Sequence, residues 1–546
     1  MTHINVTNGI SQTSERRAFS VPRWLVYALC GLLCACPMIF EELWPVSWAA
    51  LIPVLLLEKQ DRRSERHKLL QAWLRGLSFF YFYGLVVFCW FAELYPLDFI
   101  GIDADGSVAV IAVAWFGLPL LQALVSALIF PVLSILKRFP FCSGPLTFAL
   151  ESACLWTFFE WIQTLTWAGV PWGKLALTQT GFLWGIQCAF LLGSYLVCFI
   201  MVFVSGLAAG ALEQLFFKKN RRFSLVIASV ALAVFTLNFV FGAVRVETFN
   251  PEKLGKSVKA AAVQGNISSS EKWNSTPVYT IDVFEDLTFE AARQGAKLIL
   301  WPETALPYVL NSNDILKDYL NGLSNQTGAS VLAGTFTENE DGSVSNVICL
   351  SENGELSENF YSKRRLVPFG EFVPMQRVVE FLVPPLARLS AVRTTLVPGT
   401  DTAVFDTKYG NVGCLICFDS IYDSLALDTA RDGAQLICIS TNDSWFKDSS
   451  ALYEHNRHAR LRAVESGRYV VRSASTGISS VISPVGKVES FLGPMEKGVV
   501  ASDVYMIDKP TPYSIVGNAF PVMCAFIAAG MLAARIGKWS TKKRGT

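Results

Sequence analysis

Charged side chains are scarce in this 546-residue sequence. Lys, Arg, Asp and Glu make up 17% of it, whereas hydrophobic residues make up 52%. A soluble globular domain is usually about one-quarter charged, so this shortage indicates a chain that lies largely in a lipid bilayer. The formal net charge is only +1. A balance so close to zero gives no basis for binding nucleic acid, and we expect no nucleic-acid partner.

The sequence also lacks the cysteine spacing of a metal site or of a disulfide framework. Its 13 cysteines are an odd number, and their spacing is not that of metal ligands. We therefore expect neither a bound metal nor a cofactor. Most of the cysteines fall in apolar stretches, where cysteine usually acts as a small buried hydrophobic residue: Cys30, Cys34, Cys36, Cys89, Cys188, Cys198 and Cys524.

Long apolar runs are abundant. A helix needs about 20 apolar residues to cross a hydrocarbon core of about 30 Å. We predict seven membrane helices in residues 1–243, a folded domain of ordinary composition at 244–510, and an eighth helix with a basic tail at 511–546. The eight predicted spans are residues 24–41, 43–57, 70–93, 107–136, 147–166, 182–212, 223–243 and 511–535.

Basic residues mark alternate loops of this predicted membrane domain. The loops between them are acidic or nearly neutral. Because cytoplasmic loops carry an excess of Lys and Arg, both termini are predicted to be cytoplasmic, and the domain after the seventh span is predicted to lie on the opposite side. The basic clusters are Arg16, Arg17 and Arg23; Arg62, Arg63, Arg66 and Lys68; Lys137 and Arg138; Lys218, Lys219, Arg221 and Arg222; and, in the tail, Arg535, Lys538, Lys542, Lys543 and Arg544.

Two features of the predicted spans carry polar or aromatic side chains. Glu160 lies within the fifth span, where an ionisable residue is costly and often functional, but a carboxylate that faces the bundle interior or the interface is the favoured interpretation. The loop at 166–180 includes Trp172 and is rich in Trp and Gly. Anchoring at the membrane interface would by itself explain its tryptophans.

From residue 258 the sequence alternates between short apolar runs and polar helical stretches. Strands that alternate with helices of 10–15 residues indicate an α/β layered domain. In such domains, reactive groups gather at the carboxyl ends of strands. The predicted strands are 258–264, 297–301, 330–335, 411–418 and 436–441, and the predicted helices are 278–294, 313–327 and 424–432.

Three polar residues occupy positions of this kind. Glu303 follows the second predicted strand, Lys363 lies in a basic segment, and Cys417 is at the end of the fourth strand. A thiol attacks well only as a thiolate, which requires a base or a nearby positive charge. A carboxylate can accept the proton, and a lysine can stabilise the thiolate and a developing oxyanion. Together the three residue types form a complete set for acyl transfer.

Each of the three residues also has a structural interpretation. A cysteine at the position of Cys417 is more often part of the core, Glu303 can cap a helix, and Lys363 can belong to a solvated basic patch. Cys414 has the opposite parity to Cys417 along the strand, which predicts that it faces the other side. We interpret Cys414 as structural.

In combination, these segments resemble the nitrilase, or carbon–nitrogen hydrolase, superfamily. The similarity rests on three motifs in order: Trp301–Ala305, Tyr361–Glu371 and the residues around Cys417. It implies an αββα sandwich and a Glu-Lys-Cys triad, with Glu303 as general base, Lys363 as the cation on the oxyanion side, and Cys417 as nucleophile.

Further segments resemble the apolipoprotein N-acyltransferases, the membrane-embedded branch of that superfamily. Eight spans with a catalytic domain between the last two also fit, so the similarity covers nearly the whole chain. One departure is Phe418-Asp419, where that family commonly has Tyr-Glu, so the carboxylate of Asp419 is one methylene shorter. The similar segments are Val263–Asn266 with Trp273, Leu366–Pro374, Asn442–Phe446, and the helix that contains His455, Arg460, Arg462, Ala463 and Glu465.

This resemblance implies a two-step acyl transfer in a bacterial inner membrane, with the catalytic domain in the periplasm. Cys417 takes an acyl chain from a phospholipid donor and forms a thioester. The α-amino group of the diacylglyceryl-cysteine at the N-terminus of an apolipoprotein then attacks it and forms an amide. The partners implied are therefore a phospholipid, diacylated apolipoproteins and the membrane itself.

Several neighbouring residues are expected to support this chemistry. The family pattern implies that Glu371 is a second essential carboxylate near Lys363, although a surface salt bridge is the alternative, and Asp419 is expected to support the nucleophile. Water must be kept from a thioester. The candidates for the apolar lining are Trp273, Trp445, Phe369 and Phe372.

Other functions are compatible with parts of the sequence. A membrane-anchored nitrilase-type amidase that hydrolyses a small amide would use the same triad, but one anchoring span would suffice for it. A transporter or lipoprotein-binding scaffold with a degenerate domain would not need Cys417. A Cys-His protease is disfavoured because His455 and His458 are predicted to lie on a solvated or interfacial helix face.

Overall fold

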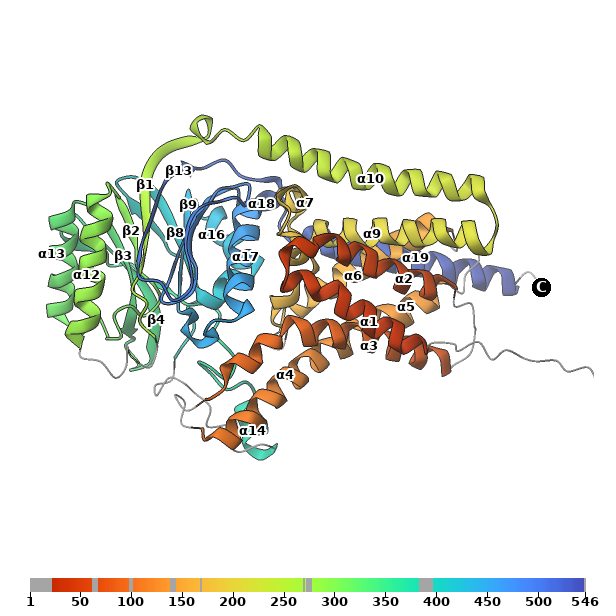
Figure 1. The fold of residues 1–546 in the computed structure, drawn as a ribbon, viewed down its shortest axis with the longest axis horizontal. Helices are drawn as coiled ribbons and strands as arrows, with labels where there is room; N and C mark the ends of the chain where they lie inside the picture. Colours follow the sequence, from red (N-terminus) through yellow and green to blue (C-terminus); the bar gives the residue numbers. More distant parts are fainter. Residues whose placement is uncertain are drawn as a thin grey trace, which may run out of the picture.

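The computed structural model describes residues 22–60, 67–97, 102–137, 144–166, 169–268, 271, 277–382 and 396–544. Figure 1 shows an elongated molecule, with a layered α/β part at one end and a bundle of helices at the other. The bundle is built from both ends of the chain, because the last long helix returns to pack against helices from the first half.

Every one of the eight predicted spans contains a helix. Within the described residues, three helical segments are long and apolar enough to cross a membrane: Ala104–Leu136, Ser194–Phe217 and Arg221–Glu247. The structure therefore supports a membrane-type bundle, and the count of eight spans is not confirmed. The bundle helices are α1 (Arg23–Ala35), α2 (Trp44–Gln60), α3 (His67–Val87), α4 (Ala104–Ser126), α5 (Ile129–Leu136), α6 (Pro145–Gln163), α9 (Ser194–Leu212), α10 (Arg221–Glu247) and α19 (Ala519–Arg544).

Three of the predicted spans contain more than one α-helix: 107–136 is divided into α4 and α5, and the other two are broken at a glycine. The segment 182–212 is divided into α7 (Leu183–Ile186), α8 (Ala189–Leu192) and α9, and the segment 511–535 into α18 (Pro512–Val516) and α19. The breaks fall at Gly193, with φ of 77°, and at Gly517, with φ of 63°. Glycine alone adopts such angles at little cost, and they end a right-handed helix. In these two segments the apolar run that was predicted as one span therefore continues across a helix break.

The α/β part consists of two sheets packed face to face. The strand order is β13-β1-β2-β3-β4-β5 in the first sheet, with β6 also paired to β4, and β12-β11-β10-β9-β8-β7 in the second. The first sheet contains β1 (Gly255–Gln264), β2 (Leu298–Leu300), β3 (Ser330–Glu338), β4 (Val344–Glu352), β5 (Glu355–Leu356), β6 (Tyr361–Ser362) and β13 (Gly498–Ile507). The second contains β7 (Val404–Thr407), β8 (Gly410–Ile416), β9 (Leu436–Thr441), β10 (Tyr469–Ala474), β11 (Ser479–Ile482) and β12 (Val488–Leu492).

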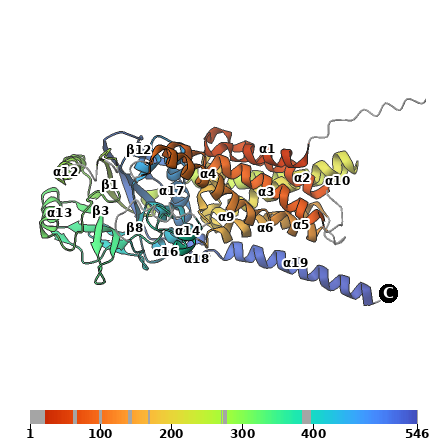
Figure 2. The ribbon, with the colours of Figure 1, turned by 90° about the horizontal axis from the view of Figure 1, so that it is seen from below.

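Helices cover both outer faces of this pair of sheets. Helices α12 (Pro277–Arg293) and α13 (Asp314–Thr327) pack on the first sheet, while α16 (Asp423–Arg431) and α17 (Ser450–Ser466) lie between the second sheet and the bundle, as Figures 1 and 2 show. The central strands β8, β9 and β10 are parallel and buried, which explains their nearly continuous apolar sequences. The predicted αββα sandwich is present.

A buried polar contact joins the bundle to the α/β part. Lys174, from the loop after α6, forms an ion pair with Asp423 at the start of α16, and both side chains are almost completely buried. Asp423 also accepts hydrogen bonds from the hydroxyl groups of Tyr195, at 3.1 Å, and Tyr513, at 2.9 Å. Side chains from the first and last parts of the chain thus converge on one carboxylate of the α/β part.

Trp172 lies at the same junction. Its indole is 2% exposed, and the indole N–H donates a hydrogen bond to the carboxylate of Glu454 on α17. Interfacial anchoring does not describe this tryptophan, because it is covered by protein on the side of the α/β part. Glu160, by contrast, faces the interior as expected: its Oε1 accepts a hydrogen bond of 2.6 Å from the backbone N–H of Leu175.

Candidate active site

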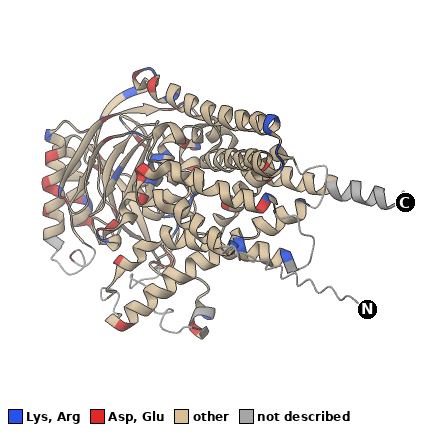
Figure 3. Cartoon of the chain, turned by 45° about the vertical axis from the view of Figure 1, so that its right-hand side comes forward, with Lys and Arg blue, Asp and Glu red and all other residues tan. Residues whose placement is uncertain are grey.

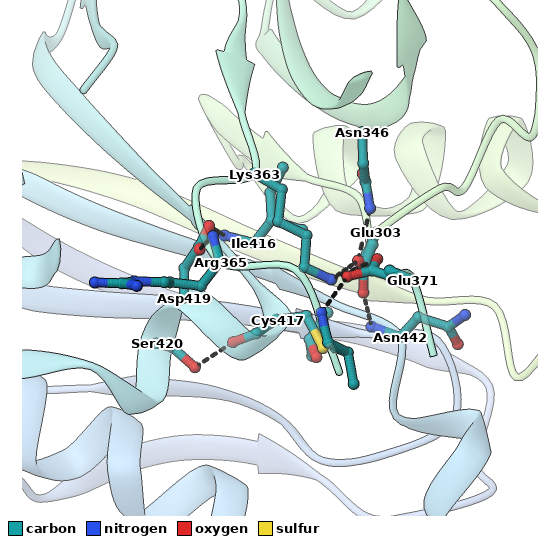
Figure 4. A network of polar contacts seen from close by, with 12 residues as sticks. Glu303, Asn346, Lys363, Arg365, Glu371, Ile416, Cys417, Asp419, Ser420 and Asn442 are labelled. Atoms are coloured by element: carbon teal, nitrogen blue, oxygen red, sulfur yellow. Dashed lines mark hydrogen bonds and ion pairs between the residues drawn. The ribbon is translucent and has the colours of Figure 1, made fainter. Parts of the chain in front are cut away.

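The three residues expected to form a triad come from strand ends of both sheets. Glu303 follows β2, Lys363 follows β6, and Cys417 follows β8. Their exposed fractions are 4%, 2% and 8%. Figure 4 shows their side chains gathered in one place, together with the side chain of Glu371. The facing sheets thus bring together residues that are 114 positions apart in the sequence, from 303 to 417.

Three donors hold the carboxylate of Glu303. Its Oε1 accepts hydrogen bonds of 2.8 Å from Lys363 Nζ and from Asn346 Nδ2, and its Oε2 accepts one of 2.9 Å from the backbone N–H of Asn442. These contacts fix both oxygens of the carboxylate. The helix-cap interpretation of Glu303 was wrong, because the described residues 301–312 contain turns and no helix.

Lys363 lies between two carboxylates. Its Nζ is 2.8 Å from Oε1 of Glu303 and 2.8 Å from Oε1 of Glu371. Burial alone would lower the pKa of Lys363, but the two carboxylates reverse this effect and raise the pKa well above its ordinary value. The side chain therefore carries a positive charge in the folded protein. The solvated-patch interpretation of Lys363 was wrong, since the side chain is buried.

Glu371 is the second carboxylate that contacts Lys363. Its Oε2 accepts a hydrogen bond of 2.8 Å from the backbone N–H of Val367, which holds the loop after Lys363 in a tight turn. Burial raises the pKa of Glu371, and the charge of Lys363 acts in the opposite direction. The pair with Lys363 is largely buried, with side-chain exposures of 2% and 13%, so it is not a surface salt bridge.

Cys417 begins a short 3₁₀ turn, η10 (Cys417–Ile421). Its φ of 48° lies in the left-handed region, which costs a residue other than glycine about 1–3 kcal/mol. Burial raises the pKa of its thiol, and Glu303 adds to this effect, while Lys363 and a hydrogen bond with Thr441 oppose it. The thiol is therefore the resting form and needs a base in order to attack.

Cys414 differs from Cys417 in its surroundings. It lies inside β8, is completely buried, and is opposite Cys438 in the pairing with β9. This agrees with the structural interpretation of Cys414.

Asp419 connects the nucleophile turn to the lysine segment. Its Oδ1 accepts a hydrogen bond of 2.7 Å from the backbone N–H of Arg365, and its Oδ2 accepts bonds from the Tyr361 hydroxyl, at 2.9 Å, and the Ile416 N–H, at 3.1 Å. Burial raises the pKa of Asp419 to about 6, with Lys363 and the backbone donors acting in the opposite direction. The shorter aspartate thus still reaches both segments.

The expected lining residues are only partly described. Trp273 lies outside the described residues. Trp445 is half-buried on the 3₁₀ turn η11 (Asp443–Phe446). This turn begins directly after Asn442, whose backbone N–H binds Glu303. Phe369 and Phe372 are half-buried on the loop after Lys363, where the N–H of Phe369 donates a 2.7 Å bond to the carbonyl of Phe372.

Several residues that hold the site were not predicted from the sequence. Asn346 is one of them, although a polar residue within the buried strand β4 is a usable signal. The prediction that His455 and His458 lie on a solvated or interfacial face was wrong, because their exposed fractions are 1% and 0%. Helix α17 is covered by the second sheet on one side and by the bundle on the other. Its many charged residues therefore make contacts inside the protein. The periodicity of a single sequence cannot distinguish such a helix face from a solvent-exposed one.

The geometry brings together a thiol, a fixed carboxylate and a buried ammonium, three groups that acyl-transfer chemistry can use. Within the part of the chain that the structure describes, no cluster of three or more His, Cys, Asp and Glu residues could hold a metal ion.

Two family models match the chain. The Apolipoprotein N-acyltransferase N-terminal domain matches residues 30–207, and Carbon-nitrogen hydrolase matches residues 259–507. The first therefore falls on the bundle and the second on the two-sheet part. The second match supports a nitrilase-like fold for that part, in agreement with the strand topology.

Relatives match over most of the chain. A protein named apolipoprotein N-acyltransferase from Gloeobacter violaceus is 28% identical over 498 residues, which is 89% of each chain. A protein of the same name from Geobacter metallireducens is 27% identical over 94% of this chain and 96% of its own. An amidase structure from Nesterenkonia sp. is 21% identical and covers 48% of this chain and 94% of its own, with a TM-score of 0.37.

Proposed function

We propose that this chain, which belongs to the apolipoprotein N-acyltransferase family, transfers an acyl chain from a membrane phospholipid to the N-terminal amino group of diacylated apolipoproteins, through a thioester on Cys417. The observation that carries the proposal is the meeting of Glu303, Lys363 and Cys417 in a buried site next to a membrane-type bundle.

In the first step, the Cys417 sulfur attacks the ester carbonyl of the phospholipid. Glu303 takes the thiol proton, an S–C bond forms, and the negative charge on the carbonyl oxygen is stabilised by the ammonium of Lys363. The ester C–O bond then breaks, and Glu303 returns the proton to the departing lysophospholipid. A base is required because burial raises the pKa of the thiol.

In the second step, the α-amino group of the acceptor attacks the thioester. An N–C bond forms, the C–S bond breaks, and Glu303 transfers the proton lost by the amine to the Cys417 sulfur. Three donors hold both oxygens of Glu303, so the carboxylate keeps one position for both proton transfers. Trp273, Trp445 and the loop residues Phe369 and Phe372 are proposed to keep water from the intermediate.

The apolar bundle supports a donor that stays in the bilayer. A small cavity of about 60 Å³ with aromatic walls lies inside the bundle, among α3, α4 and α6. A donor that remains in the bilayer reaches a tethered site at a high effective concentration. The cavity is lined by Phe79, Phe80, Tyr83, Phe88, Trp156 and Phe159, with Gln122, Glu160 and Gln163 as polar groups.

We further propose that all eight segments cross a bacterial inner membrane, with both termini in the cytoplasm and the two-sheet part in the periplasm. This arrangement divides the chain at residues 1–243, 244–510 and 511–546. The distribution of charge supports it. Figure 3 shows bundle helices that are largely uncharged, with Lys and Arg near the ends farthest from the sheets, as at Arg221 and Arg222.

Acyl transfer is tested with the full-length protein in detergent and a phospholipid labelled in its acyl chain. We expect a hydroxylamine-sensitive label on Cys417, and transfer of this label to a peptide with an N-terminal diacylglyceryl-cysteine. Cys417→Ser should abolish both, and Cys414→Ser, which alters the neighbouring strand cysteine, should retain both. Rapid release of free fatty acid without transfer would favour a hydrolase. A label on Cys414 would overturn the site assignment.

A further inference from the structure

A chain of buried polar contacts lies behind the proposed nucleophile. Nε2 of His455 is 3.2 Å from the carbonyl oxygen of Cys417 and 3.0 Å from the hydroxyl oxygen of Ser420. Nδ1 of the same ring is 2.9 Å from Oδ1 of Asp443 and 3.0 Å from Nη2 of Arg472. The exposed fractions of His455, Asp443 and Arg472 are 1%, 0% and 0%. None of these three residues has a role in the proton transfers proposed above.

The contacts favour the tautomer of His455 that carries its hydrogen on Nε2. A carbonyl oxygen only accepts, so Nε2 is favourable beside Cys417 only when it bears a hydrogen. The hydroxyl of Ser420 donates to the same carbonyl, at 2.7 Å, and so leaves its lone pairs toward the ring. In the neutral ring with its hydrogen on Nε2, Nδ1 accepts from Nη2 of Arg472, and Nε2–H is directed at the carbonyl of Cys417.

The charges behind the ring are already balanced. Nη2 of Arg472 is 2.6 Å from Oδ2 of Asp443, so this pair does not depend on His455 for neutralisation. The ring is further held by packing: Trp172 from the bundle and Phe446 lie 5.6 Å and 6.3 Å from it, measured between ring centres. The imidazole is therefore fixed in place from both the sheet and the bundle.

We propose that His455 is a positioning residue: its Nε2–H holds the carbonyl of Cys417 and thereby keeps the left-handed turn that directs the thiol toward Glu303 and Lys363. The backbone at Cys417 is strained, with φ of 48°, and such a conformation persists only where the surroundings enforce it. Two donors on one carbonyl, from Ser420 and His455, supply that constraint. This inference rests on the proposed role of Cys417 as nucleophile.

The proposal predicts a specific kinetic effect. Without the donor, the turn relaxes and the sulfur moves, and a displacement of about 1 Å costs about 100-fold in rate. Phospholipid binding should be unaffected, because His455 is 1% exposed and so presents no surface to the substrate. The first step should therefore slow at saturating phospholipid, while the phospholipid concentration for half-maximal rate stays the same.

The experiment compares three variants of the full-length protein in detergent. His455→Leu removes the donor, His455→Gln keeps an amide N–H near the position of Nε2, and His458→Gln alters the other buried histidine of α17, which has no contact with Cys417 among the described residues. Thermal unfolding is recorded for all three. We measure thioester formation from labelled phospholipid and, separately, the alkylation of Cys417 by iodoacetamide, resolved by peptide mass spectrometry.

We expect His455→Leu to lower the rates of both reactions by about 100-fold, His455→Gln to recover most of the loss, and His458→Gln to remain near the unaltered protein. Equal rates in His455→Leu and the unaltered protein would overturn the inference, and so would losses that follow thermal stability across all three variants. If the unaltered protein forms no thioester, the proposed function fails instead. Alkylation, which needs no phospholipid, then still decides whether His455 positions the thiol.

Discussion

At the scale of single residues, the site is governed by the burial of charge. Lys363 and the carboxylates Glu303 and Glu371 have side-chain exposures of 2%, 5% and 13%. Removing such groups from water is costly unless they pair with one another. The pairing also has a chemical result, because it keeps Lys363 charged next to a thiol that burial keeps protonated.

The protonated state of this thiol predicts a pH dependence. Because burial raises the pKa of Cys417, the thiolate fraction near neutral pH is small and increases with pH. The rate at which iodoacetamide alkylates Cys417 should therefore rise about tenfold for each pH unit between about 7 and 9. The measurement is alkylation followed by peptide mass spectrometry, with Cys417→Ser as the background.

A rate that is already level at pH 7 would contradict this expectation. It would mean that Lys363 lowers the pKa of the thiol more than burial and Glu303 raise it, and that Cys417 is a thiolate before substrate binds. Glu303 would then be needed only for the second step.

At the scale of elements, the site depends on segments that Asp419 ties together. The lysine segment follows β6 of the first sheet, and Asp419 lies on the turn η10 after β8 of the second sheet. Its carboxylate accepts the backbone N–H of Arg365 in the lysine segment and that of Ile416 at the end of β8. The position of the thiol relative to the lysine therefore depends on one buried side chain as well as on the strands.

Asp419→Asn tests this connection. The amide keeps the shape of the side chain but places an NH₂ group toward donors, so at least one buried N–H loses its acceptor. We expect the free energy of unfolding to fall by about 1–3 kcal/mol, and the rate of thioester formation to fall by at least about tenfold. Thermal unfolding and labelled-phospholipid assays measure the two effects.

Asp419→Glu serves as the matched comparison, since it restores the carboxylate that the family commonly has here. If Asp419→Glu is as stable and as active as the unaltered protein while Asp419→Asn is not, the carboxylate is required and the length of the side chain is not. Full activity in Asp419→Asn would refute the role assigned to this residue.

Much of the element order could be predicted from the sequence. Strands such as β9 and helices such as α13 have periodic apolar patterns and clear ends, and Asn313 caps α13 through a 3.1 Å bond to the N–H of Leu316. The breaks at Gly193 and Gly517 were missed because an apolar run continues through both. Glycine is common in membrane helices, so its presence did not distinguish a break from a continuous span.

At the scale of the whole molecule, two parts of different character share one buried junction. Lys174 and Asp423 are 249 positions apart, and neither stands out in the sequence. Neither this pairing nor the burial of α17 could be predicted from the sequence, because both depend on how the bundle packs against the second sheet. That Glu303, Lys363 and Cys417 follow strands could be predicted because they lie in recognisable motifs at strand ends.

The proposed topology predicts which surfaces a membrane-impermeant maleimide reaches in intact cells. Lys408→Cys, on an exposed turn of the two-sheet part, should be labelled without opening the inner membrane. Arg222→Cys, at the exposed start of α10, should be labelled only after the inner membrane is opened. The unaltered protein gives the background from its own cysteines. Labelling of Arg222→Cys in intact cells would contradict the assigned orientation.

The junction itself predicts a strong effect of Asp423→Asn. Burial alone would raise the pKa of Asp423, but Lys174 and Arg462 hold it well below its ordinary value, so the carboxylate is ionised in the folded protein. Its contribution to stability is present above the unfolded pKa of about 4 and is lost only as the pH falls through the lower folded value. At pH 7 the variant leaves the ammonium of Lys174 buried without its partner, which typically costs about 3–5 kcal/mol.

Thermal unfolding in detergent at pH 7 measures this cost, and the double variant Lys174→Met/Asp423→Asn provides the control. Because a buried ion pair can often be replaced by apolar groups at little net cost, we expect the double variant to recover much of the stability lost in Asp423→Asn. A double variant as unstable as the single one would mean that Tyr195 and Tyr513, which also donate to Asp423, hold the junction more than the ion pair does.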